Sequence, residues 1–112
     1  MTPKQRDILL IPIPFTDLQA VKRRPVLVLS NDNYNESTDD IVVAAITSNI
    51  EEKQFGVLIE ASDVQEGLLK RTSLIRADKI YTLNQQIIVK RFRRLKQETY
   101  RNVVNAIRTL IE

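Results

Sequence analysis

Residues 22–32 of the chain read KRRPVLVLSND, three cations and a proline followed by an apolar run and a polar turn. The ring of Pro25 fixes its own φ and biases the preceding residue, Arg24, towards extended backbone. The apolar run Val26–Leu29 has no alternation of polar and apolar residues. Strands of this kind are covered on both faces. The stretch therefore predicts a strand inside a packed sheet, covered by a helix or by a second subunit.

Short apolar runs of the same kind recur along the chain, separated by polar turns such as residues 31–35 and 49–53. They are Ile8–Ile13, Ile41–Ile46, Phe55–Ile59, Ser73–Ile75 and Ile87–Val89, with Tyr81–Leu83 as a further candidate. This rhythm predicts a mainly β fold, either a small antiparallel barrel or two packed sheets.

Two helical segments are expected. Ser62–Gln65 has capping-box spacing and Gly67 follows as a candidate stop, which predicts a single helical turn. The C-terminal segment predicts one long helix, because its apolar residues form one stripe at helical spacing. The stripe consists of Tyr100, Val103, Val104, Ile107, Leu110 and Ile111. We interpret it as core packing, with a partner-binding face as the alternative.

The composition limits the possible chemistry. The 112 residues are 43% hydrophobic and 28% charged, which predicts a single folded domain over residues 1–112. The absence of cysteine excludes disulfides and thiolate metal sites. The absence of histidine removes the commonest general base and the commonest metal ligand. We interpret the adjacent acidic pairs at 39–40 and 51–52 as solvated turns, because neighbouring side chains diverge in an extended chain. We therefore expect no bound metal and no cofactor.

No apolar run approaches the roughly 20 residues that a membrane-spanning helix needs, and residues 1–7 lack the layout of a signal peptide. We therefore expect a soluble cytoplasmic protein without a membrane partner. Its charge is uneven. Residues 1–63 hold six basic and ten acidic side chains, and residues 64–112 hold eleven basic and four acidic ones. Such asymmetry favours a polyanionic partner, and a solvated basic face is the alternative.

Four segments together resemble one known family. Residues 22–32 resemble the Arg-Pro-x-Leu-Val-Leu-Ser strand of the PemK/MazF family of toxins from type II toxin–antitoxin systems. Asp7–Leu18 resembles its opening strand and first loop, Ile41–Asn49 its central strand ending in Thr-Ser, and Gly67–Leu83 its late strands. The four segments occur in the family's order and span nearly the whole chain.

The resemblance implies a compact SH3-like barrel with a C-terminal helix, usually a homodimer. It implies a sequence-selective endoribonuclease that cuts single-stranded mRNA and is held silent by a small antitoxin protein. Three departures stand out: Arg6 where the family usually has glycine, a short first loop without glycine, and Thr72 where a proline often stands. The first two touch the RNA-facing loop and therefore bear on sequence preference.

Cutting RNA without a metal uses the substrate's own 2′-hydroxyl as nucleophile and leaves a 2′,3′-cyclic phosphate and a 5′-hydroxyl. The site must then supply a base, an acid, and donors for the extra charge on phosphorus. The resemblance places the family's catalytic arginine on Arg24 and its catalytic threonine on Thr47. Some members have Arg-x-Asp at the position of Arg76 and Asp78.

Each of these residues also has a plain structural interpretation. Arg24 could be a solvated loop charge, although its planar fork suits a phosphate. Thr47 could cap nearby backbone. Arg76 and Asp78, two apart on a predicted strand, point to one face and could form a surface ion pair or work as acid and base. Asp78 is a more natural base than Arg24, because a guanidinium is hardly ever deprotonated.

Further residues near these positions are candidates for binding the substrate. They are Ser48, Lys22, Arg23, Asp17 and Lys70. Lys90–Lys96 holds five cations in seven residues. It is a candidate contact for RNA or for an acidic antitoxin segment, or a solvated hairpin flank. Phe92 within it could stack on a base or lie in the core.

Two alternative functions use the same fold. Gyrase-inhibiting toxins bind a protein through a C-terminal aromatic residue, whereas this chain ends in Thr109–Glu112 and contains no tryptophan. The other alternative is an RNA-binding relative that has lost catalysis.

Overall fold

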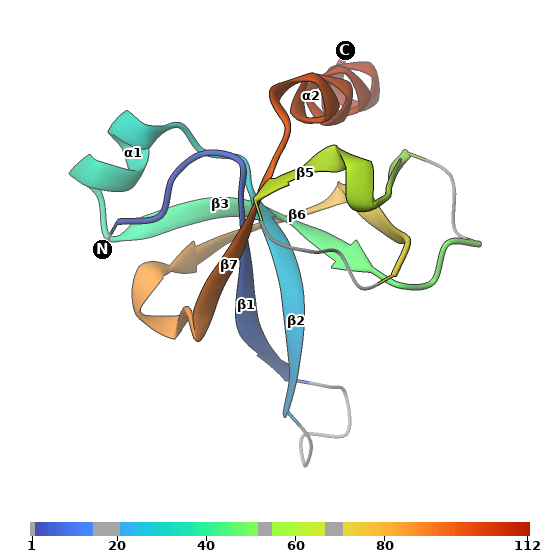
Figure 1. The fold of residues 1–112 in the computed structure, drawn as a ribbon. Helices are drawn as coiled ribbons and strands as arrows, with labels where there is room; N and C mark the ends of the chain where they lie inside the picture. Colours follow the sequence, from blue (N-terminus) through green and yellow to red (C-terminus); the bar gives the residue numbers. More distant parts are fainter. Residues whose placement is uncertain (1, 15–20, 52–54, 67–70) are drawn as a thin grey trace.

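The computed structural model describes residues 2–14, 21–51, 55–66 and 71–112. Its strands form one seven-stranded antiparallel sheet in the order β4-β6-β3-β2-β1-β7-β5, strongly curled, with the helix α2 lying across one side (Figure 1). The elements are β1 (Asp7–Pro14), β2 (Val21–Val28), α1 (Asp32–Ser37), β3 (Asp40–Thr47), β4 (Gly56–Ile59), η1 (Ala61–Asp63), β5 (Val64–Glu66), β6 (Ser73–Asn84), η2 (Gln85–Ile87), β7 (Lys90–Leu95) and α2 (Gln97–Ile111). The predicted mainly β fold with a C-terminal helix is confirmed.

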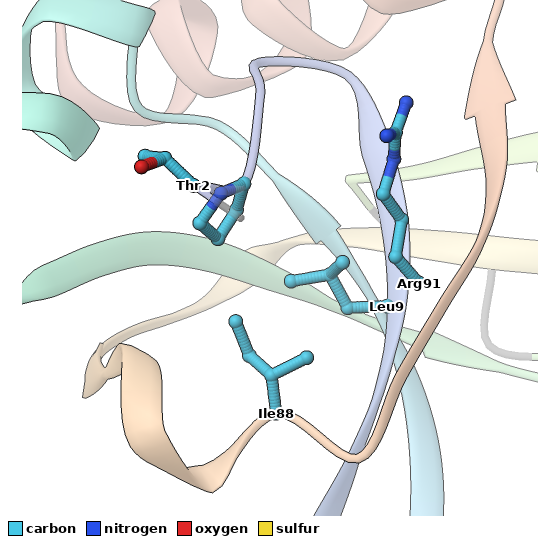
Figure 2. A pocket seen from close by; sticks show the side chains of 5 residues that line it. Thr2, Leu9, Ile88 and Arg91 are labelled. Atoms are coloured by element: carbon cyan, nitrogen blue, oxygen red, sulfur yellow. The ribbon is translucent and has the colours of Figure 1, made fainter.

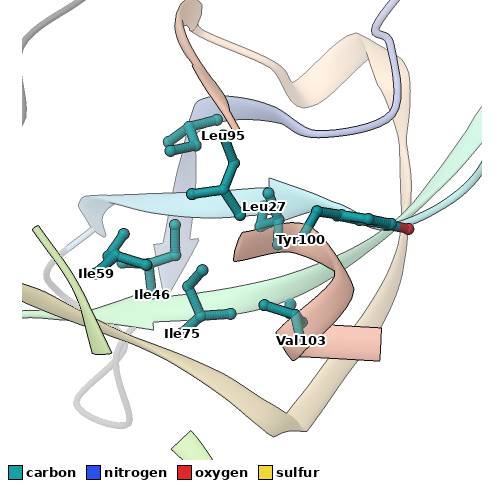
Figure 3. Close-up of a cluster of buried hydrophobic side chains, with 9 residues drawn as sticks. Leu27, Ile46, Ile59, Ile75, Leu95, Tyr100 and Val103 are labelled. Atoms are coloured by element: carbon teal, nitrogen blue, oxygen red, sulfur yellow. The ribbon is translucent and has the colours of Figure 1, made fainter. Parts of the chain in front are cut away.

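The sheet has an apolar layer on each face, as its uninterrupted apolar strands predict. On the first, which we call the helix face, buried side chains from the sheet pack against α2 (Figure 3). They are Ile8, Leu27, Ala44, Ile46, Ile59, Ile75 and Leu95, in contact with Tyr100 and Val103. On the second, the loop face, six buried side chains pack against the segment around η2. These are Leu9, Ile11, Val26, Val28, Ile41 and Val43, closed over by Leu83, Ile87 and Ile88.

Helix α2 is held by the first part of its apolar stripe. The Tyr100 hydroxyl donates a hydrogen bond of 2.7 Å to the Leu29 carbonyl, and Val103 is fully buried. The core-packing interpretation therefore holds for the first turns of the helix. Leu110 and Ile111, at the far end, are exposed. In the part of the chain that the structure describes, no helix is long and apolar enough to cross a membrane.

Two short helical segments differ from expectation. Residues 31–35, predicted as a polar turn, begin α1, because the Asn31 side chain accepts a hydrogen bond from the Tyr34 backbone N–H and caps the helix. The helical turn expected at Ser62–Gln65 lies earlier, at η1. The reciprocal side-chain bonds there join Glu60 and Asp63, so the predicted register of the capping box was wrong by two residues. Gly67 lies outside the described residues.

The late strands also differ from the prediction. Ser73–Ile75 and Tyr81–Leu83 are two parts of the single strand β6. Ile87–Val89, predicted as a strand, is the end of η2 and the link to β7, and the strand itself is the basic segment Lys90–Leu95. Leu95 is buried in the helix-face core, so this segment is not merely a solvated flank.

The departure at Arg6 has a backbone consequence. Arg6 has φ 78°, in the left-handed region that favours glycine and costs other residues roughly 1–2 kcal/mol. Its surroundings hold it there. The Arg6 N–H donates to the Val28 carbonyl at 3.0 Å, and its guanidinium donates to the Leu95 carbonyl at 2.9 Å. Arg6 thereby ties β2 to β7 in a way that a glycine, lacking the side chain, would not.

Candidate active site

Three neighbouring strands bring Arg24, Thr47 and Arg76 to the loop face. Val26 of β2 pairs with Ala45 of β3, and Ala45 pairs with Arg76 of β6. Directly paired residues of an antiparallel sheet point to the same face, and so do residues two apart in one strand. Because Val26 belongs to the loop-face core, Arg76, Arg24 and Thr47 share that face.

Arg24 and Thr47 lie where the β2–β3 ladder stops. The described ladder runs from Val26 to Val28, and the next residue of β2, Pro25, has no N–H to donate. Arg24 lies two residues before Val26 in β2 and Thr47 two residues after Ala45 in β3, so both lie just beyond the same end of this ladder. Both side chains are half-buried, so each is supported on one side and open on the other.

The Thr47 hydroxyl is oriented by the turn that follows β3. Its oxygen accepts a hydrogen bond of 3.1 Å from the Asn49 backbone N–H. This is the local backbone bond that the structural interpretation anticipated. It occupies a lone pair of the oxygen and leaves the hydroxyl hydrogen available to another acceptor. Ser48, next in the chain, is exposed.

Arg76 and Asp78 form a two-pronged ion pair. Arg76 Nε donates to Asp78 Oδ1, and a terminal guanidinium nitrogen donates to Oδ2, both at 2.9 Å. A bulge in β6 makes this possible: a single step along β3, from Ala45 to Ala44, corresponds to four steps along β6, from Arg76 to Ile80. The hydrogen bond from Arg76 lowers the pKa of Asp78 from its ordinary value, against the opposing effect of partial burial.

The remaining predicted site residues are more scattered. Arg23 is exposed, and as the neighbour of Arg24 in a strand it points to the opposite face. Lys22 lies in β2, paired with Ile13. Asp17 and Lys70 lie outside the described residues.

The basic segment contains a cluster that the sequence did not reveal. Asp7 is completely buried, and its carboxylate lies 2.9 Å from Arg91 Nε and 3.6 Å from Arg94 Nε. Two of the five cations are therefore partners of a buried carboxylate. The signal that could have indicated this is an aspartate directly before a buried strand in a chain with a late run of arginines.

A pocket of about 280 Å³ adjoins this cluster (Figure 2). Its lining is mostly apolar, with the stem of Arg91 along one side. The lining residues are Thr2, Pro3, Leu9, Ile88 and Arg91, so it shares no residue with the predicted catalytic set. Among the described residues, no group of three or more carboxylates could hold a metal ion.

Known proteins share both the sequence pattern and the fold. Residues 4–111 match the family model described as the PemK-like, MazF-like toxin of type II toxin–antitoxin systems. The Endoribonuclease EndoA of Bacillus subtilis is 31% identical over 84 residues, which cover 75% of this chain and 72% of that protein.

Two solved structures show how closely the fold agrees. The MazE–MazF complex of Deinococcus radiodurans contains a chain that superposes with a TM-score of 0.81 at 20% identity, over 99% of this chain and 97% of its own. An endoribonuclease solved with its cognate antitoxin from a mycobacterial species gives 0.78 at 20% identity, over 96% and 92%. These likenesses establish the fold.

Proposed function

We propose that this chain, which belongs to the PemK-like, MazF-like toxins of type II toxin–antitoxin systems, is a sequence-selective endoribonuclease that cuts single-stranded mRNA in the cytoplasm. The observation that carries the proposal is the meeting of Arg24, Thr47 and Arg76 on one face of three adjacent strands. Two guanidinium groups and a hydroxyl suit a phosphate that gains negative charge. The similarity to a relative named as an endoribonuclease supports it.

The reaction that suits these groups is an internal transfer at phosphorus. The substrate's 2′-hydroxyl loses its proton to solvent and bonds to the neighbouring phosphorus, while the bond from phosphorus to the 5′-oxygen breaks and that oxygen takes up a proton from solvent. The products are a 2′,3′-cyclic phosphate and a 5′-hydroxyl. Arg24 and Arg76 would neutralise the charge that develops on the phosphoryl oxygens, and the Thr47 hydroxyl would donate to one of them. The two guanidinium groups thus supply the positive charge that a metal ion would otherwise provide.

Asp78 acts in this scheme as a positioning residue. A carboxylate whose pKa lies below its ordinary value is a weak base at neutral pH. Its two bonds instead fix the plane of the Arg76 guanidinium, which orients that cation towards the phosphate. The remaining predicted contacts, Ser48, Lys22, Asp17 and Lys70, would bind the flanking RNA, whereas Arg23 points away from this face and is not part of the proposed site.

Two protein partners complete the proposal: a cognate antitoxin that silences the enzyme, and a second copy of the chain. The solved relatives from Deinococcus radiodurans and from a mycobacterial species, each in complex with an antitoxin, support the first. The excess of cations in residues 64–112 suits an acidic antitoxin segment as well as RNA.

The direct test is cleavage of end-labelled single-stranded RNAs of varied sequence in the presence of a chelator, followed by analysis of the new ends. We expect discrete cuts with cyclic-phosphate and 5′-hydroxyl ends. Activity that needs an added divalent ion would contradict the metal-independent chemistry, and no cutting of any RNA would contradict the enzyme itself.

The contribution of the Thr47 hydroxyl to catalysis can be separated from that of the side-chain shape. Thr47→Val keeps the branched side chain but removes the donor, so kcat should fall by about a hundredfold, the loss typical of one donor to a developing oxyanion. Thr47→Ser keeps the hydroxyl and should stay within a few-fold of wild type. Equal kcat for the valine and serine variants would remove Thr47 from the reaction.

The role of Asp78 predicts a particular pH dependence. Since the pKa of Asp78 is lowered in the folded protein, its contribution to stability is present above the unfolded-state pKa, near 3.8, and is lost only as pH falls through the lower folded value. The ion pair with Arg76 should therefore persist from pH 8 to pH 5. We expect Asp78→Asn to lower kcat/KM by the same factor at each pH across this range. A fall of the wild-type rate towards pH 5 that Asp78→Asn abolishes would instead make Asp78 the general base.

A further inference from the structure

Tyr81 extends the proposed site along the loop face. It pairs with Val43, as Arg76 pairs with Ala45 two residues further along β3. Val43 belongs to the loop-face core, so the Tyr81 ring points to the same face as Arg76. Two residues along a strand span about 6.6 Å. The aromatic ring therefore lies beside the Arg76–Asp78 pair.

The ring is open to solvent, unlike that of the buried tyrosine. Tyr81 is 44% exposed, whereas Tyr100 is buried and hydrogen-bonded to the Leu29 carbonyl. In the described ladders, β4 pairs only with residues 73–76 of β6. Beyond the bulge, the described pairing of β6 is with β3 alone, so no neighbouring strand is described along that edge. A planar ligand could thus approach the ring beside the cations.

We propose that Tyr81 is a stacking platform for the base of a nucleotide adjacent to the scissile phosphate. The inference rests on the proposed function and adds a binding residue to it. Tyr81 is close enough to Arg76 to contact a nucleotide that flanks a phosphate bound by Arg76, because their partners on β3, Val43 and Ala45, are only two residues apart. Unpaired bases of single-stranded RNA stack on exposed aromatic rings beside a positively charged track. The charge of the site thus favours RNA as the occupant of this surface over an apolar protein segment.

Binding of a non-cleavable RNA tests the proposal separately from catalysis. The probe is a single-stranded oligonucleotide with a 2′-deoxy sugar at the cut position and 2-aminopurine placed in turn at each flanking position. The variants are Tyr81→Ala, Tyr81→Phe and, as the matched control, Ile80→Ala. Ile80 is also exposed but pairs with Ala44 and so points to the helix face.

Loss of the ring should raise the dissociation constant about tenfold, within the range measured for removing one base–aromatic stack. We expect this for Tyr81→Ala, together with loss of the fluorescence change at one flanking position. Tyr81→Phe and Ile80→Ala should bind as wild type does. On cleavable RNA, Tyr81→Ala should raise KM and leave kcat nearly unchanged, because stacking holds substrate and transition state alike.

Three outcomes would overturn the inference. If wild type cuts RNA and Tyr81→Ala binds and cuts equally well, the proposed function stands and the platform does not exist. If wild type neither binds nor cuts any RNA, both fail. If Tyr81→Ala changes the mass of the particle in light scattering while its affinity for RNA is unchanged, the ring belongs to an interface between copies of the chain.

Discussion

Arg24→Ala is expected to lower kcat/KM for RNA cleavage by a factor of about a thousand, the upper range for losing one group that stabilises a developing oxyanion. Arg24 and Thr47 both lie just beyond the same end of the β2–β3 ladder, and Arg24 shares the loop face with Arg76. Its guanidinium can bind two phosphoryl oxygens at once, and alanine offers neither charge nor donor. The loss should appear mainly in kcat, because the extra charge on the phosphate exists only in the transition state.

Two comparisons isolate this effect. Arg24→Lys keeps the charge but not the planar fork, so its activity should lie between those of wild type and alanine. Arg101→Ala removes an exposed arginine from α2, on the helix face, and should leave the rate unchanged. Single-turnover cleavage with matched unfolding curves measures all three. If Arg24→Ala unfolds as wild type does and still cuts within tenfold of it, Arg24 does not contact the reacting phosphate.

The strands nearest the site could be predicted from the sequence because their signals are local. The apolar runs at Ile8–Ile13 and Ile41–Ile46 correspond to β1 and β3 within one residue, whereas β2 begins at Val21, five residues before the predicted run Val26–Leu29. Pro25 marks the point where the β2–β3 ladder begins. Since β-branched residues and a proline act within their own strand, no knowledge of the fold was needed to interpret them.

The late strands could not be predicted in the same way because their partners are distant in sequence. The basic strand β7 is stabilised by Asp7, which lies more than eighty residues earlier in the sequence. Because this partner is so distant, the charges of β7 alone suggested a solvated flank. The bulge in β6 interrupts the apolar pattern, so Ser73–Ile75 and Tyr81–Leu83 were predicted as two separate strands. Tyr81 could not be predicted as a binding residue for the same reason: only the register after the bulge shows which face its ring occupies.

Asp7→Asn is expected to reduce the free energy of unfolding by about 3–5 kcal/mol, the cost of breaking a buried ion pair by removing one charge. Asp7 is 0% exposed, and its carboxylate accepts the Lys4 backbone N–H at 2.8 Å in addition to its pairing with the arginines. An asparagine amide keeps the shape but removes the negative charge that faces Arg91 and Arg94 at the junction of β1 and β7. Urea unfolding followed by circular dichroism measures the change.

The two arginines should contribute unequally to this cluster. Arg91 Nε lies within hydrogen-bonding distance of the carboxylate, whereas Arg94 Nε lies at 3.6 Å, too far for a hydrogen bond. Arg91→Gln should therefore destabilise the fold more than Arg94→Gln. Asp39→Asn, at an exposed position between α1 and β3, should change the free energy of unfolding by less than about 0.5 kcal/mol. If Asp7→Asn costs no more than Asp39→Asn, the carboxylate does not hold β7 against β1, and the pairing of the basic strand must come from its apolar residues and backbone alone.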